Sequence, residues 1–260
     1  MEGELIRASG LQEALYYKDQ DSAFFAGGTG IGYKDSGIHA KKLILVPDLP
    51  GIRTITQTDG MIRIGALVTF TMALDDVKVP GYLKEALRFC GSLQKRNRAT
   101  IGGNIASWRS DSYLIPTLIA SGALIGVTGK GGEETIEIGR YAEERERFQD
   151  ALITCVLVKQ GQESAGENGV RVLSKRYANT VESHAYLTIA MGREMEEYRI
   201  GLAIRNSGIF CPDIRNWDVS WKRANVTDDF SGSEEYKRYL TGVTLESMYE
   251  KLSTEGGRES

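Results

Sequence analysis

Two glycine-rich strings far apart in the chain constrain its fold more than any other feature. They are Ala26-Gly27-Gly28-Thr29-Gly30-Ile31-Gly32 and Ala99-Thr100-Ile101-Gly102-Gly103-Asn104. Glycine lacks a Cβ atom, takes positive φ readily and lets successive N–H groups converge on an anion. We therefore expect two loops that face each other across a diphosphate. Either string alone is a weak signal, because glycine clusters mark tight turns more often than ligand sites.

Neither string matches a standard nucleotide fingerprint. The chain has no Gly-x-x-x-x-Gly-Lys-Ser/Thr string, which a P-loop requires. The first string also fails as a Rossmann motif, because its third glycine would fall at Tyr33. The prediction of a phosphate site therefore depends on the two strings together.

Charge and hydropathy exclude two classes of partner. The 260 residues carry a formal net charge of −3, so the broad basic surface typical of nucleic-acid binding is not expected. The chain starts with an acidic segment rather than the basic start of a signal peptide, and no apolar run approaches the roughly 20 residues needed to cross a bilayer. We expect a cytoplasmic protein that binds neither nucleic acid nor membrane.

The cysteines are few and scattered. Cys90, Cys155 and Cys211 are odd in number and widely separated, so neither a disulfide framework nor a metal site is indicated. Any iron–sulfur centre that works with this chain is therefore expected in a partner.

The hydrophobic pattern predicts a mixed chain with two halves. We expect strands at 23–26, 42–46, 151–158, 170–177, 186–191 and 198–204, with hairpin turns at Asp59-Gly60 and between Gly129 and Gly132. We expect helices at about 9–15, 70–77, 81–90, 114–120 and 233–252. In the last helix Tyr236, Leu240, Val243 and Met248 recur at near-helical spacing. A polar, glycine-containing stretch suggests a boundary near residue 165.

Three strings in the first half carry a family resemblance. They are Phe24-Phe25-Ala26-Gly27-Gly28-Thr29, Ile64-Gly65-Ala66 and Gln94-Lys95-Arg96-Asn97-Arg98-Ala99-Thr100-Ile101-Gly102-Gly103-Asn104-Ile105-Ala106. Together they resemble the FAD-binding subunit of molybdenum hydroxylases, the group of xanthine dehydrogenase and carbon monoxide dehydrogenase. The segment 228–239 resembles the C-terminal helix region of the same family, so the likeness covers nearly the whole chain.

The resemblance implies an α+β fold. A PCMH-like FAD-binding domain would span 1–165, with α/β subdomains at about 1–55 and 56–165. A small C-terminal domain of antiparallel sheet and helix, similar to that of carbon monoxide dehydrogenase flavoproteins, would span 166–260. These bounds agree with the hydrophobic pattern.

The resemblance also implies the residues that hold FAD. The first loop would surround the diphosphate with Phe24, Phe25, Ala26, Gly27, Gly28, Thr29, Gly30 and Ile31. The facing loop would be Thr100, Ile101, Gly102, Gly103 and Asn104. The loop amides and the side chains of Thr29, Thr100 and Asn104 would be the donors. Leu152 is similar to a residue near the adenine end, and Lys175 to a lysine beside FAD.

The sequence departs from the family pattern at three positions. Gly30 stands where the family usually has Asp or Asn. The family aspartate that bonds a cofactor hydroxyl lies nine positions after the loop asparagine, where this chain has Tyr113; Asp111, two positions earlier, is carried over as the site residue with Tyr113 as the alternative. Cys90 stands where some members have an aromatic residue.

The resemblance implies an electron-transfer role. In the family a substrate is oxidised at the molybdenum cofactor of a large subunit, electrons pass through 2Fe-2S clusters of a small subunit, and FAD passes them to an acceptor such as NAD⁺. The redox chemistry belongs to the cofactor, so no catalytic residue and no metal ligand is nominated. Two alternatives stay open: a flavin-free scaffold subunit of such a complex, and a stand-alone FAD-dependent oxidase.

Overall fold

The chain folds into two compact units that each draw on separated segments. The computed structural model describes residues 4–30, 40–46, 49, 51–162, 166, 169–180, 183–212 and 220–254. Unit 1 comprises Met1–Lys78, Ser92–Ser107 and Leu124–Val158. Unit 2 comprises Val79–Gly91, Trp108–Ala123 and Lys159–Ser260. Both units mix helices and strands, which confirms the expected α+β class, while the expected boundary near residue 165 stays a prediction.

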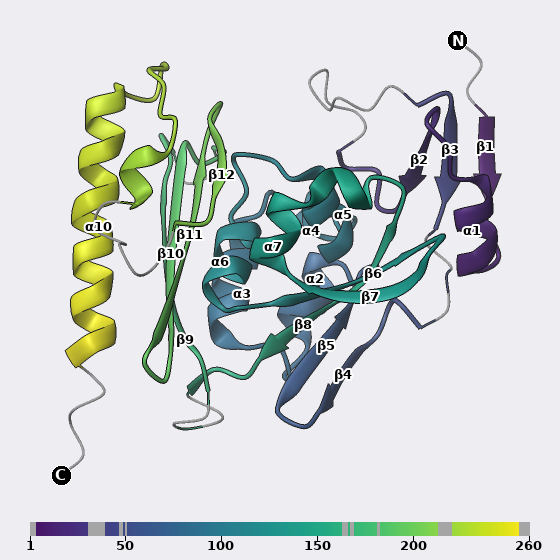
Figure 1. The fold of residues 1–260 in the computed structure, drawn as a ribbon, viewed down its shortest axis with the longest axis horizontal. Helices are drawn as coiled ribbons and strands as arrows, with labels where there is room; N and C mark the ends of the chain where they lie inside the picture. Colours follow the sequence, from purple (N-terminus) through teal and green to yellow (C-terminus); the bar gives the residue numbers. More distant parts are fainter. Residues whose placement is uncertain are drawn as a thin grey trace. The chain divides into compact units, whose positions relative to one another are not determined.

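Unit 1 begins with a small parallel sheet. Its strands run in the order β1 (Glu4–Arg7), β3 (Lys42–Leu45) and β2 (Ser22–Phe25), as Figure 1 shows in purple. Helix α1 (Leu11–Tyr17) connects β1 to β2, which lie on either side of β3. The chain from β2 then returns to form the central strand, parallel to both. The helix buries Ala14 and Leu15 in the same apolar cluster as Ile44 of β3.

A five-stranded sheet forms the rest of the unit 1 framework, in the order β4-β5-β8-β6-β7. Its strands are β4 (Ile55–Thr58), β5 (Met61–Gly65), β6 (Leu124–Gly129), β7 (Gly132–Glu137) and β8 (Leu152–Lys159). Both predicted hairpins are confirmed. In the first, Asp59 and Gly60 have φ of 50° and 76°, the left-handed conformation that a two-residue hairpin turn requires.

Short helices complete unit 1. They are α2 (Phe70–Asp75), α4 (Leu93–Arg96), α5 (Ile101–Ser107), α7 (Ile138–Glu143) and the 3₁₀ turn η1 (Arg145–Phe148). The prediction that the second glycine string is a loop is wrong, because its residues from Ile101 onward form the first turns of α5.

Unit 2 is built on an antiparallel sheet, as predicted. Its order is β12-β11-β10-β9. The strands are β9 (Arg171–Tyr177), β10 (Leu187–Glu194), β11 (Glu197–Ile204) and β12 (Gly208–Phe210). The helices are α3 (Gly81–Arg88), α6 (Leu114–Ala120), the 3₁₀ turn η4 (Trp221–Arg223) and the long α10 (Glu234–Thr254).

The two faces of this sheet differ in side-chain size. One face presents Leu187, Ile189 and Met191 to the long helix α10, with which they share a buried apolar cluster. The other face lies against α6, where Gly192 and Gly201 have no side chain to separate the backbones; a Cβ on Gly201 would lie 2.4 Å from the Pro116 carbonyl oxygen. Figure 1 shows α10 and α6 on opposite sides of the sheet.

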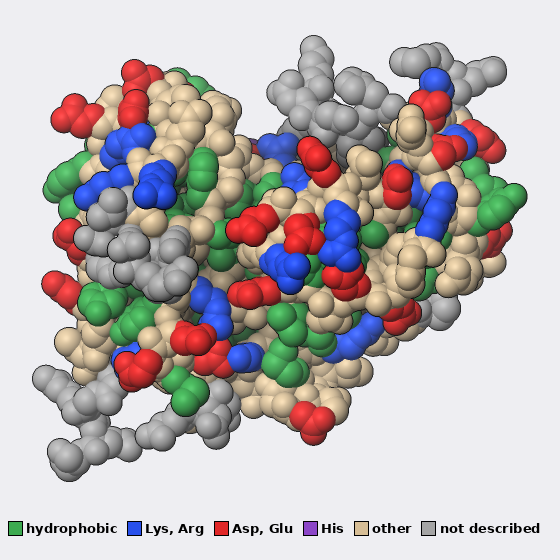
Figure 2. All heavy atoms as spheres, in the orientation of Figure 1, with side chains coloured by type: hydrophobic (Ala, Val, Ile, Leu, Met, Phe, Trp, Pro, Cys, Tyr) green, Lys and Arg blue, Asp and Glu red, His purple; other side chains and the backbone are tan. Residues whose placement is uncertain are grey.

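The visible surface carries charges of both signs. Figure 2 shows Lys and Arg side chains interspersed with Asp and Glu side chains on the face drawn. None of the helices in the described ranges combines the length and the apolar character needed to cross a bilayer.

Candidate functional site

Strand β2 leads directly into the first glycine string. Its pairing with β3 ends where the Val46 N–H donates to the Phe25 carbonyl oxygen at 3.0 Å. The chain then turns, and Gly28 takes a φ of +70°, which a residue with a Cβ rarely adopts. A loop thus begins at the carboxyl end of a parallel strand, as the sequence predicts.

The loop amides have no acceptor among the residues that the structure describes. Within the described part of the chain, no hydrogen bond is donated by the N–H groups of Gly27, Gly28, Thr29 or Gly30. No described atom lies within 4 Å of the place where a Cβ on Gly30 would stand. Consecutive unpaired N–H groups around a left-handed glycine are the geometry of an anion-binding nest. The first string is therefore suited to bind phosphate oxygens.

The second glycine string does not offer its amides. The N–H groups of Ile101 and Gly102 donate to Val68 and Ala66 carbonyl oxygens at 3.0 and 2.9 Å. Those of Gly103 and Asn104 donate to the side-chain and main-chain oxygens of Thr100, at 3.1 and 3.0 Å. In this structure these amides are therefore paired within the protein, and their contact with FAD stays a prediction.

Close packing explains the glycines of the second string. A Cβ on Gly102 would lie 2.6 Å from the Ala66 Cβ, so only glycine lets α5 approach the segment that follows β5. This contact also accounts for the Ile64-Gly65-Ala66 string, whose last residue is the one that α5 meets. The second string is thus a packing element beside the loop.

The two strings nevertheless meet. A Cβ on Gly27 would lie only 1.7 Å from the carbonyl oxygen of Arg98, which immediately precedes the second string. Arg98 is itself held by a hydrogen bond of 3.0 Å from its N–H to the Lys95 carbonyl oxygen, at the end of α4. The first loop is therefore supported by the segment that leads into α5.

Arg98 is the residue at this site that sequence reasoning did not single out. Its Nη2 atom lies 3.4 Å from where a Cβ on Gly28 would stand, so the guanidinium is beside the loop. Among the described residues no carboxylate pairs with it. The signal available in the sequence was the basic character of Lys95, Arg96 and Arg98 within the family string.

The aromatic and apolar residues around the loop divide into two groups. The Phe25 ring lies against Gly28, 2.6 Å from where a Cβ would stand there. Phe24 and Ala26 pack instead on the apolar cluster that contains Leu152. Leu152 is 7% exposed, so its observed contacts are those of a core residue.

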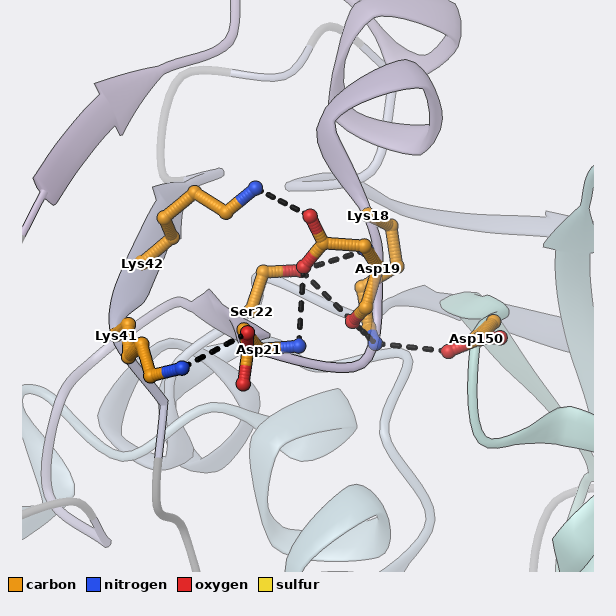
Figure 3. Close-up of polar contacts among 7 residues, drawn as sticks. All are labelled: Lys18, Asp19, Asp21, Ser22, Lys41, Lys42 and Asp150. Carbon is orange, nitrogen blue, oxygen red and sulfur yellow. Dashed lines mark hydrogen bonds and ion pairs between the residues drawn. The ribbon is translucent and has the colours of Figure 1, made fainter.

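A set of ion pairs anchors the turn that precedes β2. Lys18, almost buried, pairs with Asp150 at 2.9 Å and donates to the Asp19 carbonyl oxygen at 2.9 Å (Figure 3). The Asp19 carboxylate pairs with Lys42 of β3. The Asp150 contact ties the turn to the segment before β8, so the strand that leads into the loop is held from both sheets of unit 1.

Asp111 belongs to unit 2, and its carboxylate is already paired. Its two oxygens accept hydrogen bonds of 2.9 and 2.8 Å from Arg109, and the His184 Nδ1 lies 3.4 Å away. Burial alone would raise the pKa of Asp111, but the hydrogen bond and charge of Arg109, with His184 and Arg205, outweigh it and lower that pKa.

Tyr113, unlike Asp111, has a polar atom without a hydrogen-bond partner among the described residues. It is 6% exposed, and its hydroxyl has no hydrogen-bond partner among the described residues. Its ring stacks with Phe89 at a centroid distance of 6.0 Å, and the Arg176 guanidinium lies 5.0 Å from its centroid. Of the two candidates for the cofactor hydroxyl contact, Tyr113 has the unsatisfied polar atom.

The remaining predicted residues are placed as follows. Lys175 is an exposed residue of β9 whose Nζ lies 5.8 Å from the centroid of Tyr177. Thr29 is half-buried in the first loop, and Thr100 is buried as the residue that caps α5. Ile31 lies outside the described residues.

Comparison with known proteins assigns the family. The family described as "FAD binding domain in molybdopterin dehydrogenase" matches residues 1–158. The chain belongs to this family. Membership identifies FAD as the cofactor and an oxidoreductase as the class of enzyme, as the sequence strings indicated. The unpaired amides of the first loop fit the diphosphate of that dinucleotide.

The chain matches one curated relative over nearly its full length and another over only a small part of it. YgfM, an uncharacterized protein of Escherichia coli K12, is 29% identical over 262 residues that cover 95% of both chains. Aldehyde oxidase 2 of Cavia porcellus is 26% identical over 152 residues, which are 52% of this chain and 11% of that protein.

Two solved structures share the fold over nearly the full length of the chain. Reconstituted carbon monoxide dehydrogenase from Oligotropha carboxidovorans superposes with a TM-score of 0.77 at 17% identity, covering 94% of this chain and 95% of that one. Quinoline 2-oxidoreductase from Pseudomonas putida 86 gives 0.75 at 16% identity and 93% of both chains. These likenesses confirm the expected fold.

Proposed function

We propose that this chain is the FAD-binding electron-transfer subunit of a multi-subunit molybdenum-dependent dehydrogenase. The observation that carries the proposal is the row of unpaired amides from Gly27 to Gly30, held in place by the close approach of Gly27 to Arg98. A diphosphate offers several anionic oxygens to such a row of donors. FAD, when bound, accepts electrons singly and releases them as a pair.

The residues of the chain bind and orient the cofactor. The loop after β2 would receive the diphosphate, and the Phe25 ring would cover one side of that loop at Gly28. Thr29 and Asn104 are half-buried residues of the two strings, and their hydroxyl and amide groups would complete the contacts. No acid–base residue is assigned, because the reaction needs none from this chain.

The partners in this proposal are a large subunit that holds the molybdenum cofactor and a small subunit with 2Fe-2S clusters, and electrons leave FAD for an acceptor such as NAD⁺. Support comes from the names of similar proteins, which include a copper- and molybdenum-containing carbon monoxide dehydrogenase. The matched segment is 11% of aldehyde oxidase 2, so such an enzyme requires parts beyond that segment.

Titration of the purified chain with FAD tests the proposal. We expect saturable binding, followed by the loss of free-flavin fluorescence, and competition by ADP, which shares the diphosphate. The holoprotein should oxidise no substrate by itself and should gain activity only with the partner subunits. A properly folded chain that binds no FAD would contradict the proposal and favour the flavin-free scaffold, whereas turnover by the isolated chain would favour the oxidase.

A further inference from the structure

We propose that Arg98 binds the diphosphate of the cofactor, closing the first loop with its guanidinium. This assignment rests on the proposed function, because it presumes that the loop of Gly27 to Gly30 receives a diphosphate. It adds a charged side chain to a site whose other proposed donors are main-chain amides and the neutral side chains of Thr29 and Asn104.

The position of Arg98 is determined by its main chain. Its N–H donates to Lys95 at 3.0 Å, and the next residue, Ala99, both donates to Lys95 at 2.7 Å and accepts from the Phe70 N–H at 3.0 Å. Its carbonyl oxygen stands against Gly27, where no side chain fits. The Arg98 main chain is therefore packed against the first loop, and this contact places its side chain beside that loop.

The charge of Arg98 is available to a ligand. Its Nη2 atom lies beside Gly28, at 3.4 Å from the place of the missing Cβ. The side chain is exposed, and within the described residues it has no ion pair or hydrogen bond to satisfy it. In the described part of the chain, the Arg98 guanidinium thus has no carboxylate partner and lies next to four amides that have no acceptor. These two independent features together form one anion site.

The chemistry favours arginine at such a position. The planar guanidinium offers several N–H groups in a fork that can contact two phosphate oxygens at once, whereas an ammonium is a single point charge. A hydrogen bond to a charged group contributes enough to change affinity about ten- to hundredfold.

The test compares Arg98→Gln with Arg98→Lys and with a matched control, Arg53→Gln. Arg53 is an exposed arginine of the same unit, and in the described part of the chain it makes no hydrogen bond to either glycine string. Dissociation constants are measured for FAD, ADP and riboflavin at several salt concentrations. Circular dichroism and thermal unfolding of the apoproteins check that each variant folds.

We expect Arg98→Gln to weaken FAD and ADP about ten- to hundredfold and to reduce the salt dependence of both. Riboflavin, which has no phosphate, should bind equally to all variants. Arg98→Lys should lose less affinity than Arg98→Gln because it keeps the charge, and Arg53→Gln should match the unmodified chain.

Two results separate the two proposals. If the unmodified chain binds no FAD, the proposed function fails. If it binds FAD but Arg98→Gln behaves like Arg53→Gln, or loses riboflavin as strongly as FAD, only the assignment of Arg98 is overturned. Should Arg98→Gln not fold, Arg98→Lys decides: FAD affinity and salt dependence equal to those of the unmodified chain would refute the assignment.

Discussion

At the residue scale, the candidate site depends on the absence of one Cβ atom. Gly27 lets the carbonyl oxygen of Arg98 approach the loop, and a methyl group there would stand 1.7 Å from that oxygen. From the sequence alone we expected glycine in this string because its amides would bind the ligand. In the structure the reason at Gly27 is contact with another segment of the protein.

Gly27→Ala should therefore destabilise the apoprotein, by about 1–3 kcal/mol, because the backbone of one string must move. The matched control is Gly30→Ala, since no described atom lies within 4 Å of its added methyl group. Urea unfolding without FAD measures both. Equal stability of the two variants would show that the loop and Arg98 are not in contact in solution.

At the scale of elements, hydrophobic spacing predicted most helices and strands. Helix α6 has the bounds expected, 114–120, and α10 spans Glu234–Thr254 where about 233–252 was expected. The buried face of α10 differs, however: Tyr236 and Val243 are 46% and 39% exposed, while Lys237 is completely buried. Spacing identifies a helix, but it does not show which polar residue will find a partner.

Lys237 is buried because two groups compensate its charge. Its Nζ pairs with Asp229 Oδ2 at 2.9 Å and donates to the Thr227 carbonyl oxygen at 2.8 Å. Lys237→Met should cost about 3–5 kcal/mol of unfolding free energy, because it leaves the nearly buried Asp229 carboxylate without its cation. Lys251→Met, at an exposed position of the same helix, is the control. Chemical denaturation that finds no difference between them would refute this account.

The second glycine string shows the same limit of sequence reasoning. Glycine is a poor helix former, so Gly102-Gly103 predicts a loop. The structure makes these residues helical because Thr100 caps the helix through the Gly103 N–H and because Gly102 packs on Ala66. Propensity is local, whereas the contact with Ala66 joins segments far apart in sequence.

At the scale of the whole molecule, the two units should respond differently to acid. The carboxylates Asp111, Glu194 and Asp229 belong to unit 2. Burial would raise the pKa of each, but Arg109, Lys159 and Lys237 respectively outweigh burial and lower it. In unit 1 the pKa values of Glu13, Asp19 and Glu144 are also lowered, but there a side-chain hydrogen bond, and not burial, is the largest influence on each.

A carboxylate whose pKa is lowered by folding stabilises the folded protein at pH values above its ordinary pKa. This stabilisation is lost as the pH falls from the ordinary pKa through the pKa in the folded protein. The ordinary values are 3.8 for the two aspartates and 4.5 for Glu194. Between about pH 5 and pH 3, unit 2 should therefore lose stability before unit 1. Tryptophan fluorescence reports unit 2, because the segments of unit 1 contain no tryptophan.

Hydrogen exchange of the β6 amides reports unit 1 in the same titration. Asp111→Asn should reduce the pH dependence of the tryptophan signal and leave β6 protection unchanged. Loss of β6 protection at a higher pH than the tryptophan transition would contradict the prediction.

The sequence by itself determined the class of fold, the hairpin turns, most element positions and the family, because these follow from local patterns of hydrophobicity, glycine and motif. It also located the loop after β2. Only the tertiary structure decided that Arg98 lies beside Gly28 and that Asp111 is paired with Arg109. It alone also decided which amides lack a hydrogen-bond partner among the described residues, and that the Tyr113 hydroxyl lacks one there too. The physical reason is that hydrogen bonding and charge compensation depend on which groups the folded chain brings within a few ångströms of one another.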